Sequence, residues 1–291
     1  MSETFIEKWQ KTVDNKKSVL CAGLDPAEYE MGRGNEGLPQ GTNKRDWALN
    51  YVEAVAPHCA AIKPNYQYWK DEKDVSALRD IIDLSHSKGL LVIDDSKLAD
   101  IGSTNDAGIF YSGKNGFDAV TFSPFAGNIA EAAKQGKARN IGVICMCLMS
   151  NPEYERQKNS LIPISAEEQN VFGKDVQYVG DVPHIKQYMW LANQAKNNGL
   201  AGIVIGAPSK KNHLTEDEIM NAFVYAGTDM TVLCPGLGKQ AGESKLLFTY
   251  FLATNVVVNV GRALMFPDGG ATHQETAKYF NKSLNDERFK A

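Results

Sequence analysis

The sequence predicts an α/β protein with a (β/α)8 barrel fold, the TIM barrel. Two observations support this fold: eight short runs rich in Val, Ile, Ala and Cys, and amphipathic segments between them. Runs with so little polar alternation are typical of parallel strands that are covered on both faces. The alternation extends over ~250 residues, which is the usual size of this barrel. We therefore expect residues 1–291 to form a single barrel domain with two additional segments.

The predicted strands follow one another along the whole chain. They are residues 18–25, 59–65, 90–95, 117–123, 140–150, 201–208, 231–236 and 255–261. The predicted helices between them are residues 43–58, 74–89, 184–199, 214–227 and 244–255. An open doubly wound sheet is the alternative, but it predicts fewer strands and a GxGxxG loop after the first strand. The segment CAGLDPAE at that position lacks this loop.

Two segments lie outside the regular alternation. The N-terminal segment MSETFIEKWQKTVDNKK is charged and amphipathic, so it predicts an opening helix and not a signal peptide. Residues 151–183 form a long polar connection after the fifth strand. Connections of this length usually cover a site or are disordered. We expect an excursion at the rim of the active site, and a simple surface insertion is the alternative.

Composition and charge exclude several classes of protein. The net charge is −4 and no long basic block occurs, which argues against nucleic acid or an anionic membrane as a partner. No apolar stretch approaches the ~18–20 residues of a membrane-spanning helix. The five cysteines lie in or beside apolar strand-like runs, so we expect reduced, buried thiols and a cytoplasmic protein.

Charged residues gather where the predicted strands end. The third strand runs into LLVIDDSKLADIGST, with Asp95, Lys97 and Asp100 within six residues, and the second strand ends at Lys63. A solvated turn is the alternative for this short motif. However, the carboxyl ends of barrel strands share one mouth, where chemistry occurs in this fold. Charges there can pair with one another, which offsets the cost of removing them from water.

A second signal lies at the ends of the last two strands. The segment PGLGKQAGE (235–243) offers glycines for close backbone approach before a predicted helix, and Gly261 and Arg262 follow the eighth strand. Barrels often bind phosphate with these two loops, and a guanidinium suits a phosphate group. An ordinary turn with a surface arginine is the alternative. The histidines have no metal-ligand spacing, so we expect no metal site. The motif GxSxG is absent, so we expect no nucleophile elbow.

Together these motifs resemble those of the orotidine 5′-phosphate decarboxylase family. The resemblance rests on AIKPN, DSKLADIGST, MSNP, PGLGKQAGE and NVGRA, which occur in the family's order and span most of the chain. It implies decarboxylation of orotidine 5′-phosphate to UMP and CO₂, a step of pyrimidine biosynthesis, without a metal or an organic cofactor. It also implies a homodimer.

The resemblance assigns roles to individual residues. Lys63, Asp95, Lys97 and Asp100 match the family's charged tetrad, in which Lys97 is the proton donor. The implied substrate-binding residues are Asp25 and Asn65 near the ribose, Ser150 at the pyrimidine, and Pro235, Gly236, Gln240, Gly261 and Arg262 around the phosphate. Asp100, Ile101 and Thr104 match positions that reach the neighbouring subunit's site.

Three other functions compete with this interpretation. A magnesium-dependent sugar-phosphate decarboxylase can share the D-x-K-x-x-D motif, but the first two strands lack the expected acidic metal partner. A non-catalytic phosphate-binding protein predicts the loss of a tetrad residue, and none is missing. An aldolase would need a neutral lysine, whereas neighbouring carboxylates favour the ammonium form.

Overall fold

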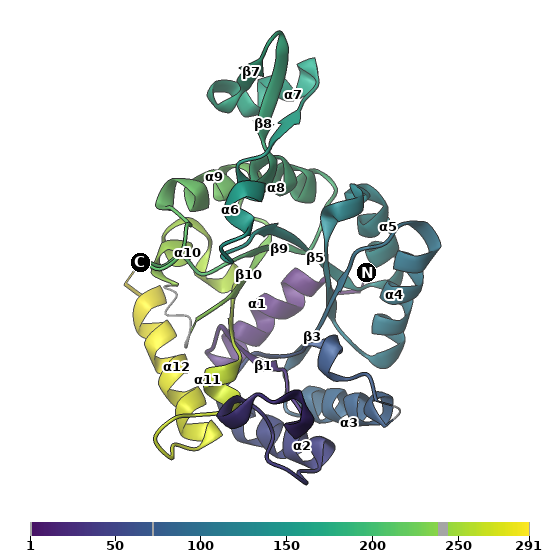
Figure 1. Ribbon diagram of the computed structural model, residues 1–291, viewed down its shortest axis with the longest axis vertical. Coiled ribbons are helices and arrows are strands. Elements are labelled where there is room, and N and C mark those ends of the chain that lie inside the picture. The colour runs from purple at the N-terminus through teal and green to yellow at the C-terminus, as the bar shows by residue number, and fades with distance from the viewer. Residues whose placement is uncertain (1, 72, 238–243, 291) are drawn as a thin grey trace.

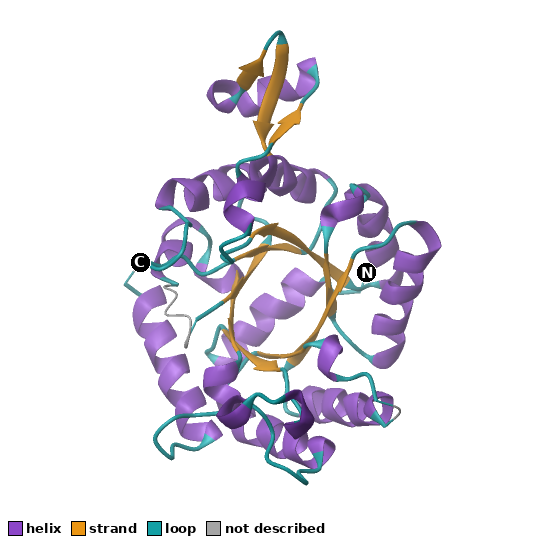
Figure 2. Ribbon diagram, in the orientation of Figure 1, coloured by secondary structure: helices purple, strands orange, loops and turns teal. Residues whose placement is uncertain are grey.

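The barrel predicted from the sequence is present and closed (Figure 2). A computed structural model describes residues 2–71, 73–237 and 244–290. All pairs of neighbouring barrel strands are parallel, in the order β1-β11-β10-β9-β5-β4-β3-β2. The strands are β1 (Leu20–Leu24), β2 (Ala61–Pro64), β3 (Leu91–Leu98), β4 (Ala119–Phe122), β5 (Gly142–Leu148), β9 (Gly202–Ile205), β10 (Thr231–Pro235) and β11 (Val256–Val260). Each of the eight predicted strands is therefore confirmed.

Helices surround the barrel (Figure 1). They are α2 (Lys44–Val55), α3 (Asp74–Ser87), α4 (Gly102–Asn115), α5 (Ile129–Arg139), α8 (Gln187–Asn197), α9 (Glu216–Ala226), α10 (Lys245–Tyr250), α11 (Arg262–Met265) and α12 (His273–Arg288). The prediction that a helix starts at residue 184 is wrong, because residues 184–186 pair with residues 161–163 in a strand. Of the helices around the barrel, α4, α5, α11 and α12 were not among those predicted.

The opening helix α1 (Phe5–Lys16) is confirmed and crosses the amino end of the barrel (Figure 2). Its Trp9 is fully buried. Lys8 pairs with Asp118, directly before β4, at 3.1 Å, and Gln10 donates to Asn255, directly before β11, at 2.8 Å. The helix thus closes the end of the barrel opposite to the predicted site.

The excursion after β5 folds into a small lobe with its own sheet. It contains α6 (Tyr154–Lys158), β6 (Leu161–Pro163), α7 (Ala166–Phe172), β7 (Gln177–Val179) and β8 (Val182–Lys186), and the sheet is antiparallel with the order β6-β8-β7. Figure 1 shows that α7, β7 and β8 project outward beyond α8 and α9, whereas α6 lies beside the barrel. The expectation that the whole excursion lies at the rim of the active site is therefore wrong for the sheet.

The cysteines behave as expected from the sequence. All five are buried and free. Burial raises the pKa of Cys147 to about 12, so its thiol stays protonated and unreactive at neutral pH. Within the described residues, no helix combines the length and the hydropathy needed to cross a bilayer.

Candidate active site

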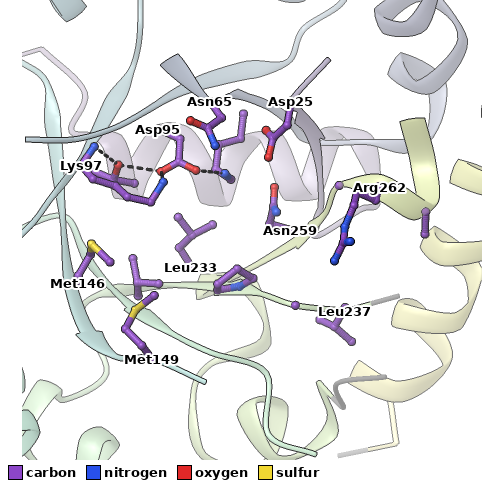
Figure 3. A pocket seen from close by; sticks show the side chains of 17 residues that line it. Asp25, Asn65, Asp95, Lys97, Met146, Met149, Leu233, Leu237, Asn259 and Arg262 are labelled. Carbon is purple, nitrogen blue, oxygen red and sulfur yellow. Dashed lines mark hydrogen bonds and ion pairs between the residues drawn. The ribbon is translucent and has the colours of Figure 1, made fainter. Parts of the chain in front are cut away.

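A cavity of about 270 Å³ opens at the carboxyl ends of the barrel strands (Figure 3). It brings together most of the residues that the sequence singled out. The predicted residues that line it are Asp25, Lys63, Asn65, Asp95, Lys97, Pro235, Gly236, Gly261 and Arg262. Charged groups from the second and third strands and the loops after the last two strands therefore share one cavity.

A chain of two lysines and one aspartate forms one side of the cavity. Lys97 Nζ lies 2.7 Å from Asp95 Oδ1, and Lys63 Nζ donates a hydrogen bond to Asp95 Oδ2. Lys63 and Asp95 are only 5% and 6% exposed. Burial alone would raise the pKa of Asp95, but the two ammonium groups outweigh burial and hold this pKa well below its usual range. The carboxylate is therefore ionised throughout the physiological pH range.

The same balance acts on Lys63. Burial disfavours its charge, but the carboxylates of Asp95 and Asp25 outweigh burial and raise its pKa. Asp25 follows β1 directly, and its own pKa is raised by burial, an effect that Lys63 opposes. The charges of this side of the cavity are thus held in place by one another before any ligand arrives.

Lys97 has an unusual backbone conformation. Its φ of +51° lies in the left-handed region, which side chains other than glycine rarely adopt. The predicted strand ends at residue 95, but β3 continues to Leu98, and its pairing with β4 shifts register between Asp94 and Leu98. Such an irregularity re-aims a side chain. Here it directs Lys97 toward Asp95 and the cavity.

Thr121 on β4 holds this irregular segment. Its Oγ1 accepts a hydrogen bond from the Lys97 backbone N at 2.9 Å and lies 3.0 Å from Asp95 Oδ1, to which it donates. Behind the cavity, Asp94 accepts hydrogen bonds from Ser96 and from Ser112 on α4. The segment that carries Asp94, Asp95 and Lys97 is therefore held by neighbours on β4 and α4.

The opposite end of the cavity is formed by the loops that follow β10 and β11. Gly236 has a φ of +98°, which glycine adopts without strain. A Cβ at Gly23 would lie 2.9 Å from the Cα of Gly261, so β1 and the turn after β11 approach closely only with glycine there. Arg262 begins α11 and pairs with Glu36 at 2.9 Å. Gln240, which the sequence also placed here, lies outside the described residues.

Four predicted site residues do not line this cavity. Asp100, Ile101 and Thr104 are exposed, with 60% of Ile101 accessible. Ser150 lies in a neighbouring hollow, next to Asn151 and His213. A residue that contributes to another subunit's site must be exposed in its own subunit, and Asp100, Ile101 and Thr104 are exposed. Ser150 directly follows Met149, which lines the cavity with the two lysines.

Sequence reasoning missed two polar residues of the cavity and its apolar wall. The polar residues are Thr121 and Asn259, and the wall consists of Met146, Met149, Val204 and Leu233. Asn259 carried a usable signal, because it interrupts the apolar run that begins at Val256. Thr121 carried almost none, since threonine is common in strands.

The comparisons with known proteins identify relatives over the whole chain. The family model "Orotidine 5′-phosphate decarboxylase / HUMPS family" matches residues 18–271. The orotidine 5′-phosphate decarboxylase of Natronomonas pharaonis is 28% identical over 300 residues, which cover 98% of this chain and 100% of that protein. That of Variovorax paradoxus is 28% identical over 293 residues, which cover 97% of each chain.

Solved structures share the fold. The OMP decarboxylase of Leishmania donovani superposes with a TM-score of 0.73 at 22% identity, covering 99% of this chain and 100% of that one. The UMP synthase of the same organism gives a TM-score of 0.75 at 23% identity. This chain spans 57% of that longer protein.

Proposed function

Because this chain belongs to the orotidine 5′-phosphate decarboxylase / HUMPS family, we propose that it decarboxylates orotidine 5′-phosphate to UMP and CO₂. The observation that carries this proposal is the chain Lys63–Asp95–Lys97 in one cavity with Arg262. The reaction would be a step of pyrimidine biosynthesis in the cytoplasm. It would need neither a metal nor an organic cofactor.

The two ends of the cavity give the substrate an orientation. The phosphate would lie at Arg262, Gly261 and the loop that begins with Pro235 and Gly236, the loop to which Gln240 also belongs. A guanidinium and backbone N–H groups are suited to a phosphate dianion. The ribose would lie near Asp25 and Asn65, and the pyrimidine would extend toward Lys97, with Ser150 at its far edge.

In the proposed mechanism, the lysines and aspartates act on the charge that develops at the ring. Loss of CO₂ leaves an electron pair on carbon six of the pyrimidine, with no ring carbonyl placed to delocalise it well. The Lys97 ammonium would stabilise this carbanion and then protonate it, while Asp95 and Lys63 hold the ammonium in position. An array that is set in advance needs little reorganisation as the charge develops. The apolar wall opposite would strengthen these interactions once the bound substrate displaces water from the cavity.

The phosphate group would contribute to the rate of decarboxylation although it takes no part in the chemical step. Binding energy gained at a remote part of a substrate can be used to orient the reacting part. The cavity supports this arrangement, because Arg262 and Lys97 lie at opposite ends of it in Figure 3.

We further propose that the active unit is a homodimer. Asp100, Ile101 and Thr104 would reach into the partner's site and complete the tetrad there. The exposed position of this segment supports the idea, as does the side chain of Phe125, which is 91% exposed in the loop after β4. An isologous interface of this kind places the same segment in both sites.

The function is tested by mixing the purified protein with orotidine 5′-phosphate in the presence of EDTA. We expect the absorbance of the orotate ring to change to that of UMP at the same rate as in the absence of EDTA. A protein that carries Lys97→Ala serves as the control for contaminating activity. Loss of activity with EDTA and its return with Mg²⁺ would instead favour a metal-dependent sugar-phosphate decarboxylase.

The dimer is tested by mixing two inactive variants, Lys97→Ala and Asp100→Ala. If Asp100 serves the partner's site, a mixed dimer has one doubly damaged site and one intact site. Random exchange of equal amounts then restores about a quarter of the wild-type activity. Subunit exchange is verified with differently tagged chains, and verified exchange without recovery would place Asp100 in its own subunit's site.

A further inference from the structure

Asn259 is a buried amide that no predicted role accounts for. It lies on β11, is 8% exposed and lines the cavity between the Asp25 and Arg262 ends (Figure 3). Its Oδ1 atom is buried and has no hydrogen-bond partner among the described residues. Asn259 therefore lines the cavity with an acceptor that no described residue satisfies.

An unpaired acceptor at this place is costly. A buried polar atom without a partner usually costs ~1–3 kcal/mol relative to one that is hydrogen-bonded. Asp25 Oδ1 is a second buried acceptor without a partner in the described part of the chain. The nearby ammonium of Lys63 is already bound to Asp95. Two acceptors in one cavity thus lack the donors that would satisfy them.

The position of Asn259 indicates which part of a nucleotide would supply a donor. Its register partners are Cys21 on β1 and Pro235 on β10, and a Cβ at Gly23 would lie 3.4 Å from its Oδ1. The amide oxygen therefore lies against β1, the strand that leads into Asp25. A phosphate dianion offers no donor to an amide oxygen, whereas the hydroxyl groups of a sugar do.

We propose that Asn259 is a substrate-binding residue that accepts a hydrogen bond from a ribose hydroxyl, next to Asp25. This inference rests on the proposed nucleotide substrate. The two unpaired acceptors would together receive the vicinal diol of the ribose. Asn259 would thereby distinguish ribonucleotides from deoxyribonucleotides, in addition to any contribution from Asp25.

The test measures binding of UMP, 2′-deoxy-UMP and 3′-deoxy-UMP by isothermal titration calorimetry. For each protein, the ratio of each deoxynucleotide's Kd to that of UMP reports the value of one hydroxyl group. We expect Asn259→Leu, which has a similar volume and no hydrogen-bonding group, to weaken UMP binding about tenfold. The ratio for the contacted hydroxyl should fall by a similar factor, because the variant has lost that contact.

Two controls separate this effect from damage to the fold. Asn259→Asp keeps an acceptor and should keep the ratio, although its charge weakens binding of all three anions. Asn197→Leu removes an exposed amide on α8 and should change neither affinity nor ratio. Equal ratios in wild type and Asn259→Leu would overturn the inference, even if overall affinity fell. A wild-type protein that binds no UMP would instead overturn the proposed nucleotide substrate.

Discussion

Arg262 and Glu36 form an ion pair at the rim of the barrel, with Nη1 of Arg262 2.9 Å from Oε2 of Glu36. Glu36 ends a short 3-10 helix, Gly34–Glu36, in the loop between β1 and α2, and Arg262 follows β11. The two residues are 226 positions apart in the sequence. A phosphate bound to this guanidinium would either share it with the carboxylate or replace the carboxylate.

Arg262→Ala should raise KM about 10- to 100-fold, with a smaller effect on kcat, because a hydrogen bond to a charged group is worth ~1.5–3 kcal/mol. Steady-state kinetics with orotidine 5′-phosphate measures this. With the nucleoside orotidine, which lacks the phosphate, the wild-type protein and the Arg262→Ala variant should have almost the same kcat/KM. The matched control is Arg45→Ala, which removes another ion-paired arginine, on α2. Equal losses for nucleotide and nucleoside would show that Arg262 does not act through the phosphate.

Glu36→Gln should lower KM two- to fivefold, since it removes a negative charge next to the expected phosphate position. The effect is small because both side chains are partly exposed, at 47% for Arg262 and 34% for Glu36, and such pairs contribute only ~0–1 kcal/mol. It should shrink further in 0.5 M salt, which screens the repulsion. Glu30→Gln, in the same loop, is the control. A rise in KM would mean that Glu36 orients the arginine for the phosphate.

Thr121→Val should lower kcat about tenfold while UMP binding stays within a factor of two. Valine has the shape of threonine but cannot hold the Lys97 backbone N or the Asp95 carboxylate, so both groups lose a fixed position. Thr121→Ser keeps the hydroxyl and should retain most of the activity. If valine and serine variants turn over equally fast, the hydroxyl is not a positioning group.

Lys97→Gly should be more stable than Lys97→Ala by roughly 0.5–1 kcal/mol, the reverse of the usual order. Both variants lose the ammonium and should be inactive, so the comparison isolates the backbone. Glycine adopts the φ of +51° at this position without strain, whereas alanine does not. Urea unfolding of the two variants provides the measurement. Greater stability of the alanine variant would mean that the segment relaxes out of the left-handed region.

His86→Gln should reduce stability more at pH 5.5 than at pH 8.5. The hydrogen bond to Asp118 raises the pKa of His86, an effect that partial burial opposes. A raised folded-state pKa contributes stability below the unfolded value of ~6.5, and this contribution is lost as the pH rises through the folded value. Thermal melts at the two pH values test this. The control His184→Gln, in the lobe, removes a ring that contacts the backbone carbonyl of Val182, and it shows how much of the change comes from the replacement of histidine by glutamine itself. A pH-independent loss in His86→Gln would contradict the prediction.

The barrel could be predicted because its strands are local patterns. Each run of apolar residues is buried on both faces, so hydrophobicity alone marks it. Helix α4, with the sequence GSTNDAGIFYSGKN, has no such pattern, and its helical state depends on packing against α3 and α5. Residues 184–186 were misassigned because their pairing partners lie in the lobe, more than twenty residues away.

The site could be predicted as a set of residues but not as a geometry. Charges at strand ends indicate the mouth of a barrel, which is why Lys63, Asp95 and Lys97 were found. The left-handed backbone of Lys97 depends on Thr121, which is 24 residues away. The pairing of Arg262 with Glu36 likewise results from the closure of the barrel, which brings β11 next to β1.

The part of the lobe from β6 to β8 leaves and rejoins the rest of the chain at one neck, where the N of Gln187 donates to the carbonyl O of Ser160 at 2.9 Å. Because the two ends of this part meet at the neck, a change in its length or sequence need not alter the strand register of the barrel. The neck does not make the lobe independent, because Glu168 accepts from Trp190 at 3.2 Å and Tyr225 donates to Asp175 at 2.5 Å. A chain without this lobe would therefore leave Trp190 Nε1 and the Tyr225 hydroxyl on the outer helices without these two partners.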